Sequence, residues 1–426
     1  MAVEEPLHVL IVGAGFGGLG CAIACRRQGL KVTVFDQVEK FLPLGDSIGF
    51  GANSTKLFKR WGILDDMLKI ACTAKFGTMY NMDGTELGTD PTEGLSEEKY
   101  GTQSIIGHRG HLHMILLEHA RAAGAEILSG SKIVDYDVNK PSVILESGKE
   151  FIGDVVIASD GVRSVGRQQV LGFFDKPIHS GYAVYRSVAD ATPLKNDPVA
   201  GKFVDNGDTL NIWIGPDVHA VVISLNGGKQ INSAITHQDI GDIDEGWSYP
   251  GKVEDVLELI KDWDPALKRV WEITPTVVDW KLVYRPCLDK WVTDSGLVAI
   301  MGDAAHPFVP TSSQGASQAV EDGATIALCL AKAGKGNIPL ALNSYFKLRY
   351  AYVAKAQAGG IAQRKKWHEN HNEKGELISQ PEIKGGMLDS MALWSHDAEK
   401  EFHDRCDVVF AEVQADLAGK PLTNGK

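Results

Sequence analysis

The sequence predicts an α/β fold in which a parallel sheet, covered by helices, carries an inserted and mostly antiparallel sheet. Continuous apolar runs at residues 8–12 and 297–301 are typical of strands buried on both faces, as in parallel sheets. Between about residues 176 and 284, short segments alternate apolar and polar side chains and are separated by turn residues, which is typical of half-buried antiparallel strands. Because the runs typical of buried strands lie on both sides of the alternating segments, we expect one domain to be built from discontinuous pieces.

The N-terminal part contains a compact β-α-β unit. Residues 8–12 are the first predicted strand, and residues 19–28 are predicted as a helix of small and apolar residues. The helix ends at Gly29, where glycine is favoured after a helix. Residues 31–36 are the second predicted strand. The order strand, helix, strand indicates a parallel pair joined by a helical crossover.

Residues 13–18 (GAGFGG) form a glycine loop between this strand and helix. They fit the pattern GxGxxG, and Asp36 ends the second strand, which is the context that a dinucleotide site requires. Gly13 would make the sharp turn, Gly15 would let a pyrophosphate approach the backbone, and Gly18 would let helix and strand pack closely. The helix start offers free N–H groups to phosphates, and Asp36 would accept hydrogen bonds from ribose hydroxyls. We therefore predict a Rossmann-like site for an adenine dinucleotide rather than a glycine turn without a ligand.

The remaining elements follow from hydrophobic periodicity. Residues 53–70 and 110–123 carry apolar residues at helical spacing, the first with a break at Gly62. Short strands are predicted at residues 142–145 and 154–158, and further helices at 253–262, at 316–332 and over most of 339–417.

Composition and charge exclude several classes of function. The 426 residues suffice for two or three domains. A net charge of −12 with no dense run of Lys or Arg argues against nucleic acid or an anionic membrane as a partner. Residues 1–5 lack the positive charge of a secretory signal, and glycines interrupt the apolar stretch 8–25, so we expect neither a signal nor a membrane span. The six cysteines form no CxxC pair, which favours buried thiols in a reducing, cytoplasmic compartment.

Two further motifs flank the inserted sheet. Residues 160–167 (DGVRSVGR) match DGxxSxxR, and residues 302–307 (GDAAHP) follow the predicted strand at 297–301. Together with the glycine loop, these motifs resemble, in content and order, the three fingerprints of the single-component FAD-dependent aromatic monooxygenases, the salicylate and para-hydroxybenzoate hydroxylase-like flavoproteins. The resemblance covers about residues 6–350.

The resemblance implies where FAD would bind. The glycine loop and Asp36 would hold its ADP half, Asp303 would accept a hydrogen bond from the ribityl chain, and the helix start after Gln314 would face the pyrimidine side of the flavin. Arg109 stands where the family keeps an arginine that contacts the flavin; the alternative is a surface arginine at a helix start. The residues assigned to the cofactor in this way are Gly13, Gly15, Phe16, Gly18, Asp36, Arg109, Asp160, Gly302, Asp303, Gly315 and Ala316.

The chain departs from the family pattern at three positions. Asp36 replaces the more usual glutamate, which shortens the reach of the carboxylate and keeps its chemistry. Ser313 and Ser317 replace a glycine and an asparagine that many members carry. These changes bear on the fine contacts of the flavin and leave the expectation of FAD binding unchanged.

The resemblance also divides the chain into domains. Residues 1–75, 101–175 and 285–360 are expected to form a discontinuous FAD-binding domain, residues 76–100 and 176–284 a substrate-binding β-sheet domain, and residues 361–426 a C-terminal helical segment. An enclosed and mainly apolar substrate pocket is expected between the two domains, with walls from residues 45–51, 182–188, 211–225 and 307–314.

The activity implied by the resemblance is oxygen transfer. NADH or NADPH would reduce the flavin, dioxygen would add to it, and the resulting hydroperoxide would pass one oxygen atom to an electron-rich phenol, aniline or indole. A likeness in general form to fungal indole-alkaloid monooxygenases leaves room for an epoxidase and for a role in secondary metabolism. The expected partners are a small aromatic substrate and dioxygen, with a monomer or a homodimer as the working unit.

Asp46 and Arg186 are the candidate catalytic residues. A phenol usually gains reactivity by losing a proton, so a base or a cation beside it would help. Asp46 lies in the glycine-rich loop after the second strand, and Arg186 lies on a strand expected to face the pocket. The alternatives are a turn-capping aspartate and an arginine in a structural ion pair. An indole would need no base, because its ring is already nucleophilic.

Other interpretations stay open or lose support. A flavin oxidase or dehydrogenase would share the FAD site without transferring oxygen, whereas a flavin-free binding protein would have no need of Asp303. No GxSxG motif supports a hydrolase, and the spacing of His108, His111 and His113 does not point three rings at one metal ion. We interpret four large aromatic residues as core or domain-interface side chains rather than as walls of a cavity: Trp213, Trp280, Tyr284 and Trp291.

Overall fold

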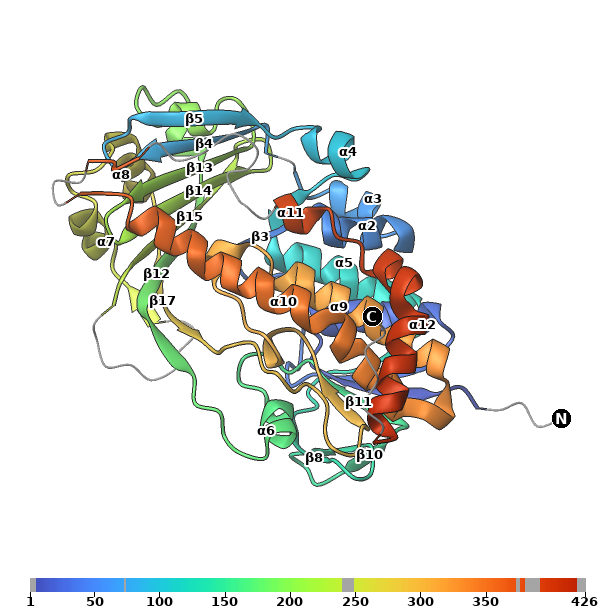
Figure 1. Ribbon diagram of the computed structural model, residues 1–426. Helices are drawn as coiled ribbons and strands as arrows, with labels where there is room; N and C mark the ends of the chain where they lie inside the picture. The colour runs from blue at the N-terminus through green and yellow to red at the C-terminus, as the bar shows by residue number, and fades with distance from the viewer. Residues whose placement is uncertain (1–4, 73, 240–248, 373–375, 380–390, 420–426) are drawn as a thin grey trace.

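A computed structural model describes residues 5–72, 74–239, 249–372, 376–379 and 391–419 of the chain. Figure 1 shows two unequal parts, a large sheet at the upper left and a set of helices around a smaller sheet at the lower right. The long helix α10 (Ile338–His368) extends from the second part to the first.

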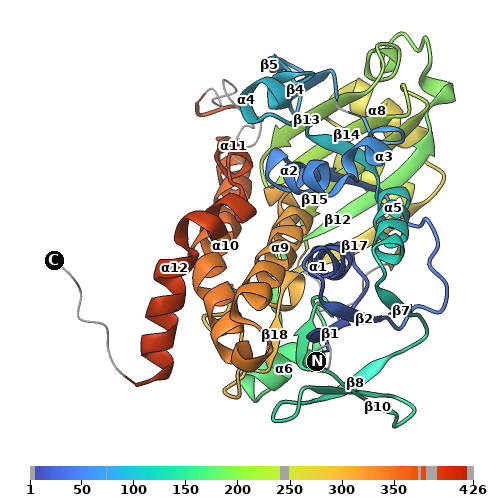
Figure 2. The same cartoon turned by 90° about the vertical axis from the view of Figure 1, so that its right-hand side faces the viewer.

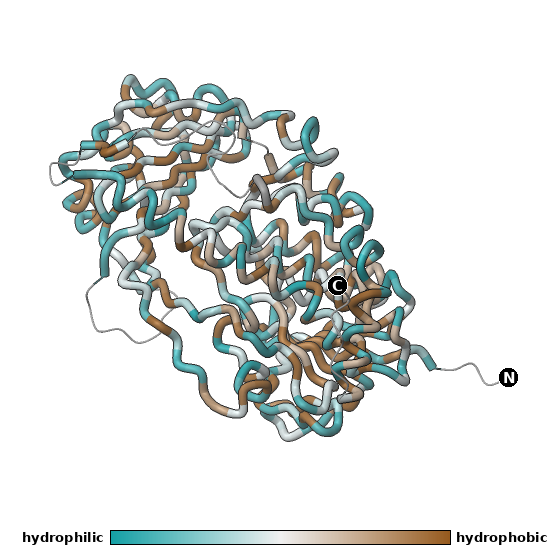
Figure 3. The backbone as a smooth tube through the Cα atoms, in the orientation of Figure 1, coloured by the Kyte–Doolittle hydropathy of each residue, from teal (hydrophilic) through white to brown (hydrophobic). Residues whose placement is uncertain are grey.

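The smaller sheet has five strands, all parallel. They are β1 (His8–Val12), β2 (Lys31–Phe35), β7 (Glu126–Leu128), β11 (Val155–Ala158) and β18 (Val298–Ile300), in the order β18-β11-β1-β2-β7. Val9, Leu10 and Ile11 of the central strand are fully buried, because a parallel sheet is covered on both faces. Figure 3 shows hydrophobic segments concentrated in this region. The strands predicted at residues 8–12 and 297–301, which lie far apart in the chain, thus both pair with β11 in one sheet.

Helices cover one face of this sheet. Figure 2 shows α1 (Phe16–Arg27), α5 (Arg109–Ala122) and α9 (Gly315–Ala333) on one side. On the other side lie α6 (Val165–Leu171) and a three-stranded sheet of β8 (Ile133–Asp137), β9 (Ser142–Leu145) and β10 (Glu150–Ile152). Strands β3 (Ser47–Phe50) and β6 (Ile105–His108) pair with each other as a two-stranded antiparallel ribbon. Gly62, with φ of 74°, separates α2 (Ala52–Trp61) from α3 (Leu64–Leu68) at the predicted break.

The larger sheet has eight strands in the order β16-β17-β12-β15-β14-β13-β4-β5. Its pairs are antiparallel except β13 with β4, which is parallel. Because side chains alternate between its faces, one face packs on α7 (Val253–Leu259) and α8 (Pro265–Glu272), and the other faces the helices. The strands are β4 (Phe76–Asn81), β5 (Glu86–Pro91), β12 (Ile178–Asp190), β13 (Thr209–Gly215), β14 (Val218–Leu225), β15 (Gln230–Gln238), β16 (Tyr249–Gly251) and β17 (Val277–Tyr284).

The predicted α/β fold with an inserted, mostly antiparallel sheet is confirmed. The expectation of one helical stretch over most of 339–417 is only partly right. Helix α10 ends at His368, residues 371 and 377 form an isolated β-bridge, and α11 (Met391–Trp394) and α12 (Ala398–Leu417) follow; part of the stretch lies outside the described residues. Three of the described α-helices were not predicted: α4 (Leu95–Tyr100), α6 and α8. The division into three domain segments stays a prediction; α10 runs without a break through residue 360, where the sequence places a boundary.

Among the described residues, no helix is both long enough and apolar enough to cross a membrane. In the same part of the chain, no group of three or more His, Cys, Asp or Glu side chains could hold a metal ion.

Candidate FAD and substrate site

The glycine loop packs against itself and leaves space on one side. A Cβ on Gly13 would lie 2.2 Å from the carbonyl oxygen of Ser159, and one on Gly18 would lie 1.9 Å from that of Gly13. A Cβ on Gly15, by contrast, would meet no described atom within 4 Å. Helix α1 begins after Gly15, and no described side chain caps it. Free N–H groups at a helix start beside open space suit a pyrophosphate.

Two side chains fix this loop from outside. The carboxylate of Asp36 accepts hydrogen bonds from the backbone N–H groups of Ala14, at 2.7 Å, and Val38, at 2.8 Å. His113 donates from Nε2 to the carbonyl oxygen of Ala14 at 2.6 Å, and burial lowers the pKa of this histidine. Phe16 points into the core, where it packs edge-on against Phe50 with ring centroids 5.2 Å apart. Phe16 therefore offers the predicted site its backbone rather than its ring.

Asp160 organises the start of α6. Its carboxylate accepts hydrogen bonds from the Tyr136 hydroxyl at 2.9 Å and from the N–H of Val165 at 2.9 Å, and it is in close contact with the Ser164 hydroxyl. Burial raises the pKa of Asp160. Arg167, the last residue of this motif, is linked to Asp160 through Ser164: the N–H of Arg167 donates to Ser164 Oγ at 2.8 Å, while its guanidinium bonds Asp175. The contact of Asp160 with a cofactor stays a prediction.

Asp303 stands at the centre of the GDAAHP segment. Its carboxylate forms no hydrogen bond to any described residue and lines a pocket, where the residue is exposed; desolvation by the neighbouring protein nevertheless raises its pKa. Below it, the Nε2 atom of His306 lies 2.6 Å from Asp322 Oδ2, which also accepts from the N–H of Gly302 at 3.0 Å. Arg349 donates to the other oxygen of Asp322 at 2.9 Å. A buried ionic network thus holds the segment, and Asp303 remains available to a ligand.

The start of α9 carries the two serines that depart from the family pattern. Ser313 has φ of 48°, in the left-handed region where glycine is favoured, which explains the usual glycine. Ser317 bonds the hydroxyl of Ser54 at 2.9 Å. Gln314 accepts from Asn53 Nδ2 at 3.1 Å, while its own Nε2 is buried and unpaired among the described residues. No described side chain caps the helix, so the N–H groups of Gly315 and Ala316 remain free.

Comparison with known proteins identifies the family. A sequence model described as an FAD binding domain matches residues 6–358. The chain belongs to the FAD-dependent aromatic monooxygenase family. It is 30% identical to the FAD-dependent monooxygenase nodY2 of Hypoxylon pulicicidum, over 97% of this chain and 94% of that one. It is also 30% identical to the asperlicin C monooxygenase of Petromyces alliaceus, over 85% and 81%.

Solved structures agree with this assignment. CtdE in complex with FAD and a substrate superimposes with a TM-score of 0.86 at 28% identity, covering 96% of this chain and 100% of that one. A salicylate hydroxylase in complex with its substrate superimposes with a TM-score of 0.79 at 20% identity, over 94% and 98%, which shows a shared fold. The protein is therefore an FAD-dependent monooxygenase with this fold.

The residues of the monooxygenase fit FAD. The open side of Gly15, the uncapped starts of α1 and α9, and the unpaired carboxylate of Asp303 all offer groups that a dinucleotide with a flavin ring would use. The individual residue assignments stay predictions. Gly302, with φ of 58°, would bring a Cβ to 3.1 Å from Ala319 Cβ, so a larger residue there would crowd the turn that carries Asp303.

The two candidate catalytic residues of the monooxygenase meet each other. Arg186 of β12 forms a close ion pair with Asp46, and its guanidinium lies 4.9 Å from the centre of the Trp280 ring. Burial lowers the pKa of Arg186, and the charge of Asp46 opposes this shift. Arg109 contributes its backbone N–H to the carbonyl oxygen of Asp46 at 2.7 Å, while its own side chain is exposed. The Asp46 carboxylate thus holds the Arg186 guanidinium in place beside the Trp280 ring.

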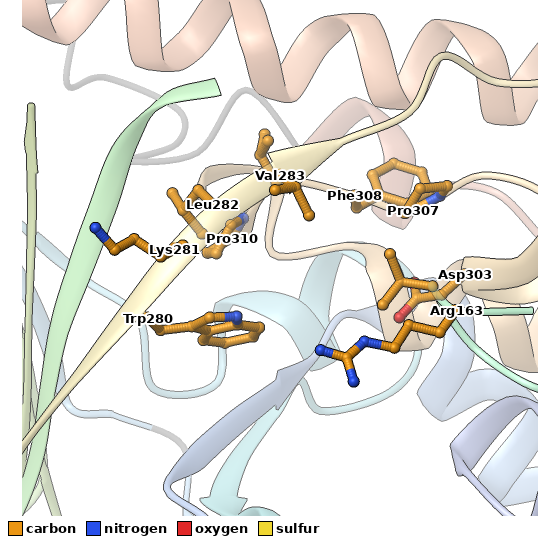
Figure 4. A pocket seen from close by; sticks show the side chains of 11 residues that line it. Arg163, Trp280, Lys281, Leu282, Val283, Asp303, Pro307, Phe308 and Pro310 are labelled. Atoms are coloured by element: carbon orange, nitrogen blue, oxygen red, sulfur yellow. The ribbon is translucent and has the colours of Figure 1, made fainter. Parts of the chain in front are cut away.

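A pocket that is partly open to solvent lies between Asp303 and β17. Figure 4 shows Asp303 and Arg163 on one side, Trp280 on the other, and Phe308 and Pro307 above them. Most of the wall is apolar, and it consists of Val162, Arg163, Trp280, Lys281, Leu282, Val283, Asp303, Pro307, Phe308, Val309 and Pro310. Such a wall limits water next to a bound ring.

This lining differs from the expected walls. Of the four expected segments, only 307–314 contributes to this pocket, and β17 was not expected to. Trp280 was interpreted as a core or domain-interface side chain rather than a cavity wall; it is not in the core, and its ring lines the pocket between the larger sheet and the Asp303 segment, whereas Trp213 and Trp291 are fully buried as expected. The alternation of polar and apolar residues in 277–284 could have placed Trp280 and Leu282 on one face, but the sequence does not say which face looks toward the flavin.

Proposed function

We propose that this monooxygenase uses NADH or NADPH and dioxygen to insert one oxygen atom into an electron-rich aromatic or indole-type small molecule. The observation that carries the proposal is the position of the pocket, between the FAD motif residue Asp303 and the aromatic strand residue Trp280. Bound FAD would supply the redox chemistry, taking electrons from the nicotinamide nucleotide and passing on one oxygen atom of dioxygen.

The residues of the chain would have separate tasks in this reaction. The N–H groups beside Gly15 and at the start of α9 would bind the cofactor, and Asp303 would orient it from the pocket side. The apolar wall around Phe308 would exclude water from the reacting centre. Arg186, held by Asp46 and stacked on Trp280, would place a positive charge where an aromatic substrate develops negative charge.

The setting in the cell is proposed on the same basis. The relative from Petromyces alliaceus is named for oxidising asperlicin C, and a role of this chain in secondary metabolism would agree with that kinship. A cytoplasmic location and a working unit of one or two chains complete the proposal.

A substrate screen tests the activity. Phenols, anilines and indoles are offered to the FAD-loaded protein, and the stimulated oxidation of NADH or NADPH is measured together with the uptake of labelled oxygen from dioxygen into the product. Label in the product supports a monooxygenase acting on that class. Stimulated oxidation with no label in the product would show the alternative, an oxidase or dehydrogenase.

A substitution tests the FAD site. Asp303→Ala is expected to yield folded protein that loses most of its flavin absorbance after purification. Asp294→Ala serves as the matched control, because Asp294 is almost fully exposed and pairs only with Lys290. Full retention of FAD by Asp303→Ala would contradict the assignment of Asp303.

A further inference from the structure

Arg364 lies near the C-terminal end of α10, one turn after Gly360. Figure 1 shows this end of the helix reaching the larger sheet. The guanidinium stands over the ring of Tyr182 on β12, 4.4 Å from its centre. The side chain is half-buried, and its Nη1 atom is enclosed. Arg364 is thus held against the sheet rather than extended into solvent.

Arg364 differs from the other arginines that are not exposed. Each of those donates to carboxylates or carbonyl oxygens, whereas Arg364 donates no hydrogen bond and forms no ion pair with any described residue. A guanidinium has five N–H donors, and burying a charge without a partner costs free energy. The paired arginines are Arg26, Arg167, Arg186, Arg269, Arg285 and Arg349.

Among the described residues, none supplies a negative charge to Arg364. Its electrostatic neighbours are the phenols of Tyr182 and Tyr284. His368, which faces it on the same helix, has its pKa lowered to about 4 and is neutral. Asp217 accepts a hydrogen bond from the Tyr182 hydroxyl at 3.1 Å and forms no ion pair with Arg364. The guanidinium stays protonated at neutral pH, so a positive charge is left over at this point of a chain whose net charge is −12.

The position of Arg364 is beside the pocket. Tyr182 pairs in register with Leu282 of β17, which lines the pocket. The preceding turn of α10 holds the opposite wall, because Thr311 donates to the carbonyl oxygen of Gly360 at 3.0 Å, next to Pro310 in the lining. Arg364 is therefore linked to the pocket from both sides, and we infer that it stands at the rim, between the sheet and the segment that follows the GDAAHP motif.

We propose that Arg364 forms an anion-binding subsite at this rim, which takes a carboxylate or phosphate group of a reactant. The planar guanidinium offers two parallel N–H donors that match either anion, and the Tyr182 ring fixes its plane. The subsite rests on the proposed function, since that reaction supplies two sources of such an anion: the phosphates of the nicotinamide nucleotide and a carboxylate on the aromatic substrate.

The experiment compares Arg364→Gln with Lys366→Gln in the FAD-loaded protein. Lys366 is an exposed cation on the same helix, so the control removes the same charge from a neighbouring position. In one arm, the dissociation constants of NADPH and NADH are measured from flavin reduction without oxygen. In the other arm, indole-3-carboxylate and indole-3-carboxamide are titrated against the oxidised protein, and binding is followed by the flavin absorbance.

Loss of Arg364 is expected to weaken binding of the anionic probe about tenfold to a hundredfold, the effect of one hydrogen-bonded charge, while Lys366→Gln has no such effect. Weaker binding of NADPH and NADH identifies phosphate as the anion. Weaker binding of indole-3-carboxylate, with unchanged binding of indole-3-carboxamide, identifies a substrate carboxylate. Arg364→Lys keeps the positive charge but lacks the two parallel N–H donors, so it should show an intermediate loss of affinity. Unchanged constants in both arms, or a wild-type protein that binds no anionic probe, would overturn the subsite. Because binding is read without turnover, this outcome is distinct from absence of label in the oxygen-transfer assay.

Discussion

The glycine loop and the pocket on the larger sheet present polar groups in opposite ways. The loop offers backbone N–H groups at the start of α1; its shape depends on the missing side chains of Gly13 and Gly18, and Gly15 leaves its outer side open. The pocket offers the side chains of Asp303 and Trp280, with the Arg186–Asp46 pair beside Trp280, from segments far apart in the chain. The loop is thus a local, short-range structure, whereas the pocket exists only when two sheets and several loops meet. Substitutions in the glycine loop should therefore affect stability or FAD binding, whereas substitutions in the pocket should affect activity.

The largest effect is expected at Gly18. A Cβ there would lie 1.9 Å from the carbonyl oxygen of Gly13, so Gly18→Ala must push α1 away from the strand before it. We expect a loss of about 3 kcal/mol or more in the free energy of unfolding, together with loss of FAD, measured by denaturant unfolding and flavin absorbance. Wild-type stability in this variant would contradict the close packing.

Gly15→Ala tests whether FAD binding in the same loop can be weakened without changing the stability of the fold. No described atom lies within 4 Å of the added Cβ, so the free energy of unfolding of the protein without FAD should stay close to that of the wild type. The affinity for FAD should fall at least about tenfold, because the methyl group would occupy the pyrophosphate's approach. Gly336→Ala, whose Cβ also meets nothing within 4 Å, is the control and should leave FAD binding unchanged. Equal affinities in the two variants would remove Gly15 from the site.

In the pocket, Arg186→Lys should keep FAD and lose activity. The substitution keeps the charge and loses the planar contacts with Asp46 and Trp280. We expect kcat/KM for an accepted aromatic substrate to fall about a hundredfold, with FAD content unchanged. Asp46→Asn should lower it too, and the double variant should be little worse than Arg186→Lys alone, since both act through one pair. Additive losses would show that the two residues act separately, and loss of FAD would show that the regions are not separable.

His396 links the C-terminal segment to the helices above the parallel sheet. Its ring lies between Glu321, at 2.6 Å, and Glu401, at 2.7 Å, and these carboxylates raise its pKa to about 9 against burial. Protonated His396 therefore stabilises the fold fully below its ordinary pKa of 6.5, and this contribution is lost as pH rises through about 9. The free energy of unfolding should fall by up to about 3 kcal/mol over that range.

His396→Gln is the check on this titration. The variant should lose most of the decline in unfolding free energy between pH 6.5 and 9, and it should retain FAD, since the glycine loop lies elsewhere. A decline as steep as that of the wild type would assign the titration to other groups.

The smallest effect is expected from two adjacent glycines of α10. Gly359 has open space around it, whereas a Cβ on Gly360 would lie 2.6 Å from Ser312 Cβ. Gly359→Ala should stabilise the helix by about 0.5–1 kcal/mol without changing activity. Gly360→Ala should lower the melting temperature and impair turnover, because it displaces the segment next to Pro310 of the pocket. Identical behaviour of the two variants would contradict this contact.

Motif-bearing segments were predictable because their chemistry is local. The strand at residues 8–12 and the break at Gly62 follow from residue pattern and glycine geometry. The strand at residues 142–145 is reproduced residue for residue. At position 313 the glycine that is usual in the family indicates a left-handed backbone conformation. The serine of this chain adopts the same conformation.

The sequence by itself determined the α/β fold class, the dinucleotide loop and the family, since each depends on residues close together in the chain. Only the tertiary structure paired Asp46 with Arg186, turned Trp280 into the pocket and left Arg364 without an ion-pair partner among the described residues. These features depend on which face of β12 and β17 meets the helices, and alternation along a strand defines two faces without saying which one is inside. Contacts between distant segments form when the apolar faces are buried together, so they are decided by packing rather than by pattern.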